Sequence, residues 1–235
     1  MVNDNFEQIR ALFAWYEIAL SEESFRLLQE YAALMWTESG IQNVTAASTL
    51  SDIWTRHFLD AAYILRYLRD DAAVIDLGTG GGIPGIPLAI LNPSLHLTLL
   101  DSEQNKISFC KMAAVRLGLQ IETVCARAEE YVRGDGVRAS FDYAVSRAMA
   151  NGSVLSELAF PFLKQNGMLL AMKGRSFDME SERFDSAAKA LGGEAPEVLR
   201  YTLEGEDKVL VLMRKTAPTP EQYPRRYAKI KRSPL

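Results

Sequence analysis

The sequence predicts an α/β fold: a doubly wound, mostly parallel sheet with a helical leader before it and an antiparallel hairpin at one edge. After about residue 70, short apolar segments alternate with segments of helical periodicity, which is typical of βαβ units. The residues before that point carry helical periodicity only. Near residue 205 two strand-like segments follow each other directly across a polar turn, and this predicts the hairpin.

Three helices are expected in the leader, because apolar residues recur there at helical spacing. Gly40 and Asn43 predict a break between Trp36 and Val44, since glycine and asparagine favour turns. The third helix is expected to begin near Asp52 and to end before residue 70.

The parallel strands are expected to be short and apolar, because strands covered on both faces are buried throughout. They cover residues 73–77, 96–100, 121–125, 141–145 and 167–172. Helices are expected after the strands, over residues 86–91, 103–117, 154–163 and 178–191. Gly118 is a plausible C-cap for the second of these helices. The hairpin would pair residues 198–203 with 208–213.

Composition predicts one α/β domain with appendages. The chain has 235 residues, of which 48% are hydrophobic, enough to bury a real core. We divide it into a helical extension (1–70), an α/β domain (71–215) and a tail (216–235). From residue 214 onward there are seven Lys or Arg and one acid, although the whole chain has a net charge of −4. Such a basic tail is expected either to bind a polyanion or to be simply solvated.

Several function classes lack their sequence signals. Cys110 and Cys125 make no metal-binding or disulfide pattern, and no metal site is expected. The N-terminal residues do not resemble a signal peptide, and no apolar run approaches the ~20 residues that span a bilayer. We therefore expect a soluble, cytoplasmic protein that does not bind membranes.

A glycine-rich loop follows the first strand, at the edge of the sheet where such folds bind ligands. Gly80, Gly82 and Gly85 match the GxGxxG spacing of dinucleotide sites, with Asp101 about 20 residues further on. Counted from the strand, however, the acid Asp76 comes first and Gly78 is the first glycine. Prolines also stand where a dinucleotide-binding helix should already be regular. The acid-first spacing resembles the first motif of class I methyltransferases.

The chemistry of S-adenosylmethionine suits this spacing. Its amino-acid end has an ammonium, which Asp76 can hold, and a carboxylate, which the amides of Gly78, Gly80 and Gly82 can meet. Asp101 ends the second strand and can accept hydrogen bonds from both ribose hydroxyls. The alternative is a tight turn with incidental acids.

Further stretches of the chain, from about residue 25 onward, carry a more specific pattern. They are Asp76–Ile90, Leu99–Ser102 with Lys106, Ser146–Ala150, Lys173-Gly174, Asn43–Ala46, Arg56–Asp60, Thr219–Arg226 and the Pro234-Leu235 ending. Together these stretches resemble the RsmG (GidB) family of bacterial 16S ribosomal RNA guanine-N7 methyltransferases. Trp36-Thr37 in the leader and Lys229–Arg232 in the tail depart from the family pattern.

The resemblance implies an enzyme with a Rossmann-like methyltransferase fold that methylates N7 of a guanine in 16S rRNA. It implies that S-adenosylmethionine is the cofactor. It also implies cofactor contacts at Gly78, Ile83, Asp101, Ala128, Glu129 and Arg147. With the residues that the loop chemistry suggests, the predicted cofactor contacts are Asp76, Gly78, Gly80, Gly82, Ile83, Asp101, Ser102, Ala128, Glu129 and Arg147. Glu129 could instead be a first-turn acid that favours a helix N-terminus.

Guanine N7 carries a free lone pair, so we expect positioning chemistry without a dedicated base, with Arg147 as the candidate catalytic residue. The expected contacts to RNA are Arg147, Lys173, Arg225, Arg226 and Lys229, with Tyr223 and Tyr227 available for stacking. The partner would be 16S rRNA or the small ribosomal subunit, and the protein itself a monomer. Two other functions stay open: a methyltransferase for a small molecule or protein, and a non-catalytic RNA-binding assembly factor.

Overall fold

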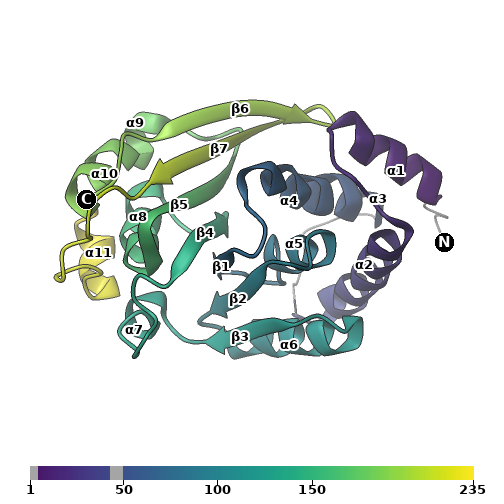
Figure 1. Ribbon diagram of the computed structural model, residues 1–235, viewed down its shortest axis with the longest axis horizontal. Coiled ribbons are helices and arrows are strands. Elements are labelled where there is room, and N and C mark those ends of the chain that lie inside the picture. Colours follow the sequence, from purple (N-terminus) through teal and green to yellow (C-terminus); the bar gives the residue numbers. More distant parts are fainter. Residues whose placement is uncertain (1–4, 43–49) are drawn as a thin grey trace.

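The computed structural model describes residues 5–42 and 50–235 and is built on a seven-stranded sheet in the order β3-β2-β1-β4-β5-β7-β6 (Figure 1). The strands are β1 (Ala73–Leu77), β2 (His96–Asp101), β3 (Ile121–Cys125), β4 (Phe141–Arg147), β5 (Leu163–Gly174), β6 (Glu197–Leu203) and β7 (Glu206–Arg214). The first five are parallel, and β7 runs antiparallel to both β5 and β6. The predicted fold class, including the antiparallel edge hairpin, is therefore confirmed.

Helices cover both faces of the sheet, with leader helices and α11 at opposite ends of the view (Figure 1). The leader contains α1 (Phe6–Trp15), α2 (Glu22–Gln42), α3 (Leu50–Ile53), a π-helical turn (Trp54–Phe58), α4 (Leu59–Tyr63) and a 3-10 turn (Ile64–Tyr67). The others are α5 (Gly85–Leu91), α6 (Gln104–Leu117), α7 (Ala128–Tyr131), α8 (Gly152–Ala159), a 3-10 turn (Phe160–Phe162), α9 (Met179–Glu182), α10 (Phe184–Leu191) and α11 (Tyr227–Arg232).

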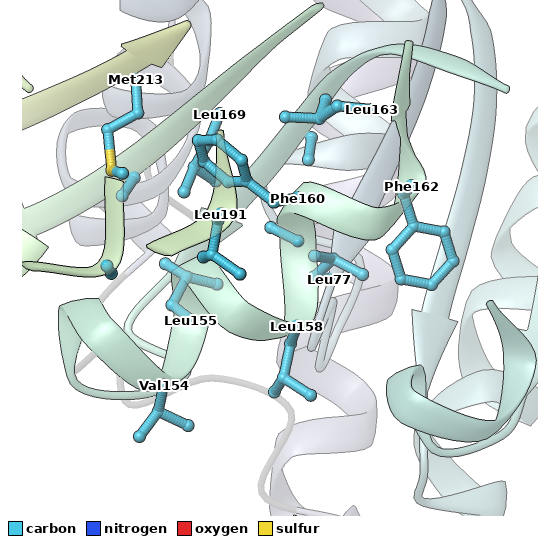
Figure 2. Packing of buried hydrophobic residues seen from close by; sticks show 14 of the residues in the cluster. Leu77, Val154, Leu155, Leu158, Phe160, Phe162, Leu163, Leu169, Leu191 and Met213 are labelled. Atoms are coloured by element: carbon cyan, nitrogen blue, oxygen red, sulfur yellow. The ribbon is translucent and has the colours of Figure 1, made fainter. Parts of the chain in front are cut away.

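Alternation along the strands divides the core between the two faces. Leu99 of β2 packs with side chains of the leader and of α6. Its neighbour Leu100 belongs to another buried cluster, together with Leu77 of β1, Leu155 of α8 and Met213 of β7 (Figure 2). The sheet is thus buried on both sides, as its apolar strands require.

Aromatic side chains join the leader to the sheet domain. Tyr31 of α2 stacks on Phe58, with ring centroids 5.6 Å apart, and on Phe109 of α6 at 6.4 Å. Trp54 and Phe13 are buried in the same cluster. The leader therefore shares one hydrophobic core with α5 and α6.

Helix α2 continues through Gly40, because one interior glycine costs a helix only about 1 kcal/mol, and it ends at Gln42, within the break predicted between Trp36 and Val44. Two other helix boundaries are wrong. The helix expected over residues 154–163 ends at Ala159 and gives way to the 3-10 turn Phe160–Phe162, because Pro161 has no backbone N–H to continue the α-helical hydrogen bonds. The helix expected over residues 178–191 is divided at Arg183, which has a φ of +55°. Residues 43–46, which carry part of the family resemblance, lie outside the described residues.

Gly118 ends α6 with a φ of +68°, and it is the predicted C-cap. Strand β5 begins at Leu163, four residues earlier than expected, because Leu163 also pairs with Phe141 of β4 before an irregularity in the ladder. These details leave the carboxyl ends of β1, β2 and β4 at one edge, where the site forms.

Candidate cofactor site

The glycine loop leaves β1 in the left-handed conformation that the chain can adopt cheaply only at glycine. Gly78, Gly80 and Gly82 have φ values of +68°, +56° and +91°. A Cβ on Gly78 would lie 2.7 Å from Cγ of Met149, so this glycine is needed for space as well as for conformation. The loop can therefore expose its backbone closely to a ligand.

Asp76 lies beneath this loop and is fully buried. Its Oδ2 accepts hydrogen bonds from the Thr79 hydroxyl (2.7 Å) and from the Gly85 amide (2.9 Å). Its Oδ1 has no hydrogen-bond partner among the described residues. Burial raises the pKa of the Asp76 carboxyl to about 6. Asp76 thus fastens the loop with one oxygen and leaves the other for a cationic or hydrogen-bond-donating group.

Asp101 ends β2 and ties the loop to the next turn. Its Oδ2 accepts from the Gly80 amide and its Oδ1 from the Glu103 amide, both at 3.0 Å. Each carboxylate oxygen can accept a further hydrogen bond. Because Asp101 also lines the adjoining cavity, a vicinal diol is a fitting ligand for it.

The cavity beside the loop has a volume of about 330 Å³. Five of the residues predicted to contact a cofactor line it: Gly78, Asp101, Ser102, Ala128 and Glu129. The other predicted contacts, Asp76, Gly80, Gly82, Ile83 and Arg147, do not line it.

Gly82 and Ile83, which do not line the cavity, lie at the rear of the loop. Ile83 is buried in the cluster that the leader shares with α5. A Cβ on Gly82 would lie 2.5 Å from Cδ1 of Ile86, and the Tyr31 hydroxyl donates to the carbonyl oxygen of Gly81. The rear of the loop therefore rests on the leader, which shapes the site without lining it.

Arg147, at the end of β4, holds the leader. Its guanidinium donates to the Arg56 carbonyl oxygen (2.9 Å), contacts Nδ1 of His57 (2.8 Å) and lies 3.6 Å from Oδ2 of Asp60. Burial, together with the Arg147 charge, lowers the pKa of His57 to about 4, so its Nδ1 accepts the hydrogen bond from Arg147. Asp60 also accepts from the Tyr201 hydroxyl at 3.2 Å.

Besides Arg147, two other cations expected to contact RNA have partners inside the chain. Lys173 Nζ donates to the Ala150 carbonyl (2.7 Å) and pairs with Glu182 (2.8 Å). Arg225 pairs with Glu157, which is fully buried. In the structure both act internally, whereas Arg226 and Lys229 are exposed on the tail.

Sequence reasoning missed several wall residues of the cavity. Met149 and Leu158 line it, as does Tyr227, which from the sequence was expected to be available for stacking on RNA. Met149 adjoins the strand-end motif at Arg147, which is the only sequence signal that pointed to it. Nothing in the local sequence ties Leu158 or Tyr227 to the loop.

The described residues contain neither a membrane-spanning helix nor a metal-binding cluster. No helix within residues 5–42 and 50–235 is long and apolar enough to cross a membrane. The same part of the chain contains no group of three or more His, Cys, Asp or Glu side chains arranged to hold a metal ion.

Solved structures with a similar fold include TrmN from Thermus thermophilus and precorrin-6y C5,15-methyltransferase from Geobacter metallireducens. The first has a TM-score of 0.52 and 19% identity, over 69% of this chain and 53% of that one. The second has a TM-score of 0.50 and 15% identity, over 68% and 88%. The fold is thus that of the Rossmann-like class I methyltransferases, with its cavity at the strand ends where such sheets bind ligands.

Sequence relatives narrow this class to one family. The family model of GidB, rRNA small subunit methyltransferase G, matches residues 24–208. Ribosomal RNA small subunit methyltransferase G of Moorella thermoacetica is 38% identical over 214 residues, 89% of each chain. Its counterpart in Clostridium beijerinckii is 37% identical over 227 residues, 93% of each chain. The chain belongs to the GidB family.

Proposed function

We propose that the protein transfers a methyl group from S-adenosylmethionine to N7 of a guanine in the 16S rRNA of the small ribosomal subunit. The observation that carries the proposal is the cavity that Gly78 and Asp101 line beside the glycine loop, whose glycines have positive φ. This cavity occurs in a chain that belongs to the GidB family. The family membership supports the RNA substrate, and the cavity supports the cofactor.

The residues at the site suit each part of this cofactor. Oδ1 of Asp76, buried without a partner among the described residues, would accept from the ammonium, directly or through water. Asp101 would accept from the ribose hydroxyls, and Ala128 and Glu129 would adjoin the adenine. The cofactor supplies an electrophilic methyl group on a sulfonium sulfur.

The protein's part in the reaction is positioning. Guanine N7 has a free lone pair, so no proton has to leave before it attacks. The enzyme must hold N7 in line with the methyl group at near-attack distance. Arg147 would help in this positioning from the end of β4, because its hydrogen bonds to Arg56 and His57 fix the guanidinium. Arg226 and Lys229 would contribute to binding the RNA backbone.

Methylation of purified substrates tests the proposal. Small subunits and naked 16S rRNA from a strain that lacks the corresponding activity are incubated with labelled S-adenosylmethionine, and 7-methylguanosine is mapped by mass spectrometry. New 7-methylguanosine at one nucleotide is the expected result. Methylation of a small molecule or protein alone, or no cofactor binding by calorimetry, would support the competing functions instead.

Gly78→Ala is the matching loss-of-function variant, and Gly118→Ala is its control. Both glycines have a φ of +68°, but only a Cβ at Gly78 meets another residue within 4 Å. Both variants should lose at least about 1 kcal/mol of stability because alanine is strained at this φ, and Gly78→Ala should lose more because its Cβ also meets Met149. Only Gly78→Ala should lose cofactor binding and methylation.

The pH dependence of cofactor binding tests the role of Asp76. Only the ionised carboxylate can pair with an ammonium, and its pKa in the free protein is about 6. Affinity should therefore be full above pH 7 and should fall as the pH drops through 6, approaching tenfold per pH unit below that value. Calorimetry from pH 5 to pH 8 measures it, and an Asp76→Asn variant should lose both the affinity and this dependence.

A further inference from the structure

The tail after β7 is bound to the sheet domain along its length. The guanidinium of Arg138 donates to three tail carbonyls, those of Tyr223 (2.9 Å), Thr219 (3.0 Å) and Pro220 (3.3 Å). Arg133 donates to the carbonyl of Pro224 at 2.8 Å. Two arginines that precede β4 thus hold the segment that leads to α11.

Two further contacts fix the position of α11 itself. The backbone amide and Nε of Arg225 donate to Oε1 of Glu157 at 2.9 and 2.8 Å, and Glu157 is fully buried in α8. Ile230, in the middle of α11, is also fully buried in the cluster beneath α8. These anchors stand on both sides of Tyr227 in the sequence, so the tail can hold that residue in place.

Tyr227 lines the cavity together with Asp101, Ala128 and Leu158. Its ring lies beneath the guanidinium of Arg127, with 5.1 Å between Cζ and the ring centroid. Tyr227 therefore lines the same cavity as the predicted ribose acceptor Asp101 and the predicted adenine neighbours Ala128 and Glu129, and Arg127 directly precedes those neighbours in the chain. A flat heteroaromatic base suits a wall of one aromatic and several apolar side chains.

We propose that Tyr227 is a cofactor-binding residue, and that the tail serves as a fixed wall for the adenosine half of S-adenosylmethionine. This rests on the proposed function, because it assigns a further residue to the same cofactor. It also changes the role of the tail, whose aromatic ring serves the cofactor while exposed cations such as Lys229 remain for RNA. Cofactor affinity then depends on Tyr227 in the absence of any RNA.

Calorimetry of the full-length protein with S-adenosylmethionine, without RNA, tests this role. Tyr227→Phe keeps the ring and should bind about as well as the wild type. Tyr227→Leu keeps an apolar side chain in contact with the cluster but removes the ring, and Tyr227→Ala removes both. Both should weaken binding about tenfold, the size expected when one aromatic–base contact is lost. Arg232→Ala, an exposed substitution in the same helix, is the control and should leave affinity unchanged.

Melting temperatures of all four variants, measured without cofactor, show whether the fold is intact. Tyr227→Leu with a wild-type melting temperature and weakened binding would support the assignment. Wild-type affinity in Tyr227→Leu and Tyr227→Ala would overturn it. A wild-type protein that binds no S-adenosylmethionine would instead remove the proposed function, so the two failures are distinguishable.

Discussion

The leader and the tail both attach to the sheet domain, but different forces hold them. The leader buries aromatic rings, among them Trp54 and Phe58, in a core that it shares with α6. The tail is held mainly by arginine hydrogen bonds and by the pair of Arg225 with Glu157, with Ile230 as its buried apolar anchor. Apolar burial is large and non-directional, whereas hydrogen bonds fix geometry for a smaller net stabilisation. The leader should therefore contribute more to stability, and the tail more to the shape of the cavity.

The largest effect is expected in the leader core. Phe58 is fully buried between Trp54 and Tyr31, with ring centroids 5.2 and 5.6 Å away. Phe58→Ala should lower the free energy of unfolding by about 3–5 kcal/mol through lost burial and a cavity. Denaturant unfolding measures it. Trp15→Ala, at a side chain that is 82% exposed, is the control and should change stability by less than about 0.5 kcal/mol.

The contact between His57 of the leader and Arg147 of β4 should make the stability of the protein depend on pH. The pKa of His57 is about 4 in the folded protein, below its ordinary value of 6.5, so the unfolded chain binds the proton more tightly. The contribution of His57 to the free energy of unfolding is then complete above pH 6.5. It decreases by up to about 3 kcal/mol as the pH falls toward 4.

Unfolding curves of the wild type and His57→Gln between pH 4.5 and pH 7.5 measure this contribution. The His57→Gln curve should be flatter than that of the wild type. His96→Gln, at an exposed histidine, should follow the wild type. Parallel curves for wild type and His57→Gln would contradict the assigned role of His57.

A smaller loss is expected from the ion pair of the tail. Glu157→Gln removes the charge that Arg225 faces, although Arg225 can still reach water, so the cost should be about 1–3 kcal/mol. The tail should also become accessible to limited proteolysis before the sheet domain unfolds. Glu221→Gln, on the exposed part of the tail, provides the comparison. Equal protease resistance in both variants would show that other contacts suffice to hold the tail.

The smallest effect concerns the exposed surface of the tail. Arg226→Ala should leave stability and cofactor affinity unchanged while weakening the binding of 16S rRNA a few-fold and lowering its salt slope by about 1. Filter binding or fluorescence anisotropy at several salt concentrations measures both quantities. Lys111→Ala, an exposed cation on α6, should behave as the wild type.

Residues close together in the sequence account for the successful predictions. The order of strands and helices and the hairpin all follow from local patterns. The phase of the glycine loop relative to Asp76 is local as well, and it favoured S-adenosylmethionine over a dinucleotide. The role of each cofactor contact stays a prediction, as does the division into three segments. The error at Arg183, where one predicted helix is divided in two, arose because tertiary contacts can outweigh a local preference of about 1 kcal/mol.

By itself, the sequence determined the fold class, the family and the candidate acids Asp76 and Asp101, since each depends on short-range periodicity or on motifs. Only the tertiary structure decided that Asp76 lies beneath the loop, that Arg147 holds the leader and that Tyr227 reaches the cavity. Tyr227 follows Asp101 by more than 100 residues, and no local pattern reports which distant surfaces meet when a chain buries its core. The tail's position at the cofactor cavity is therefore a property of the packed molecule.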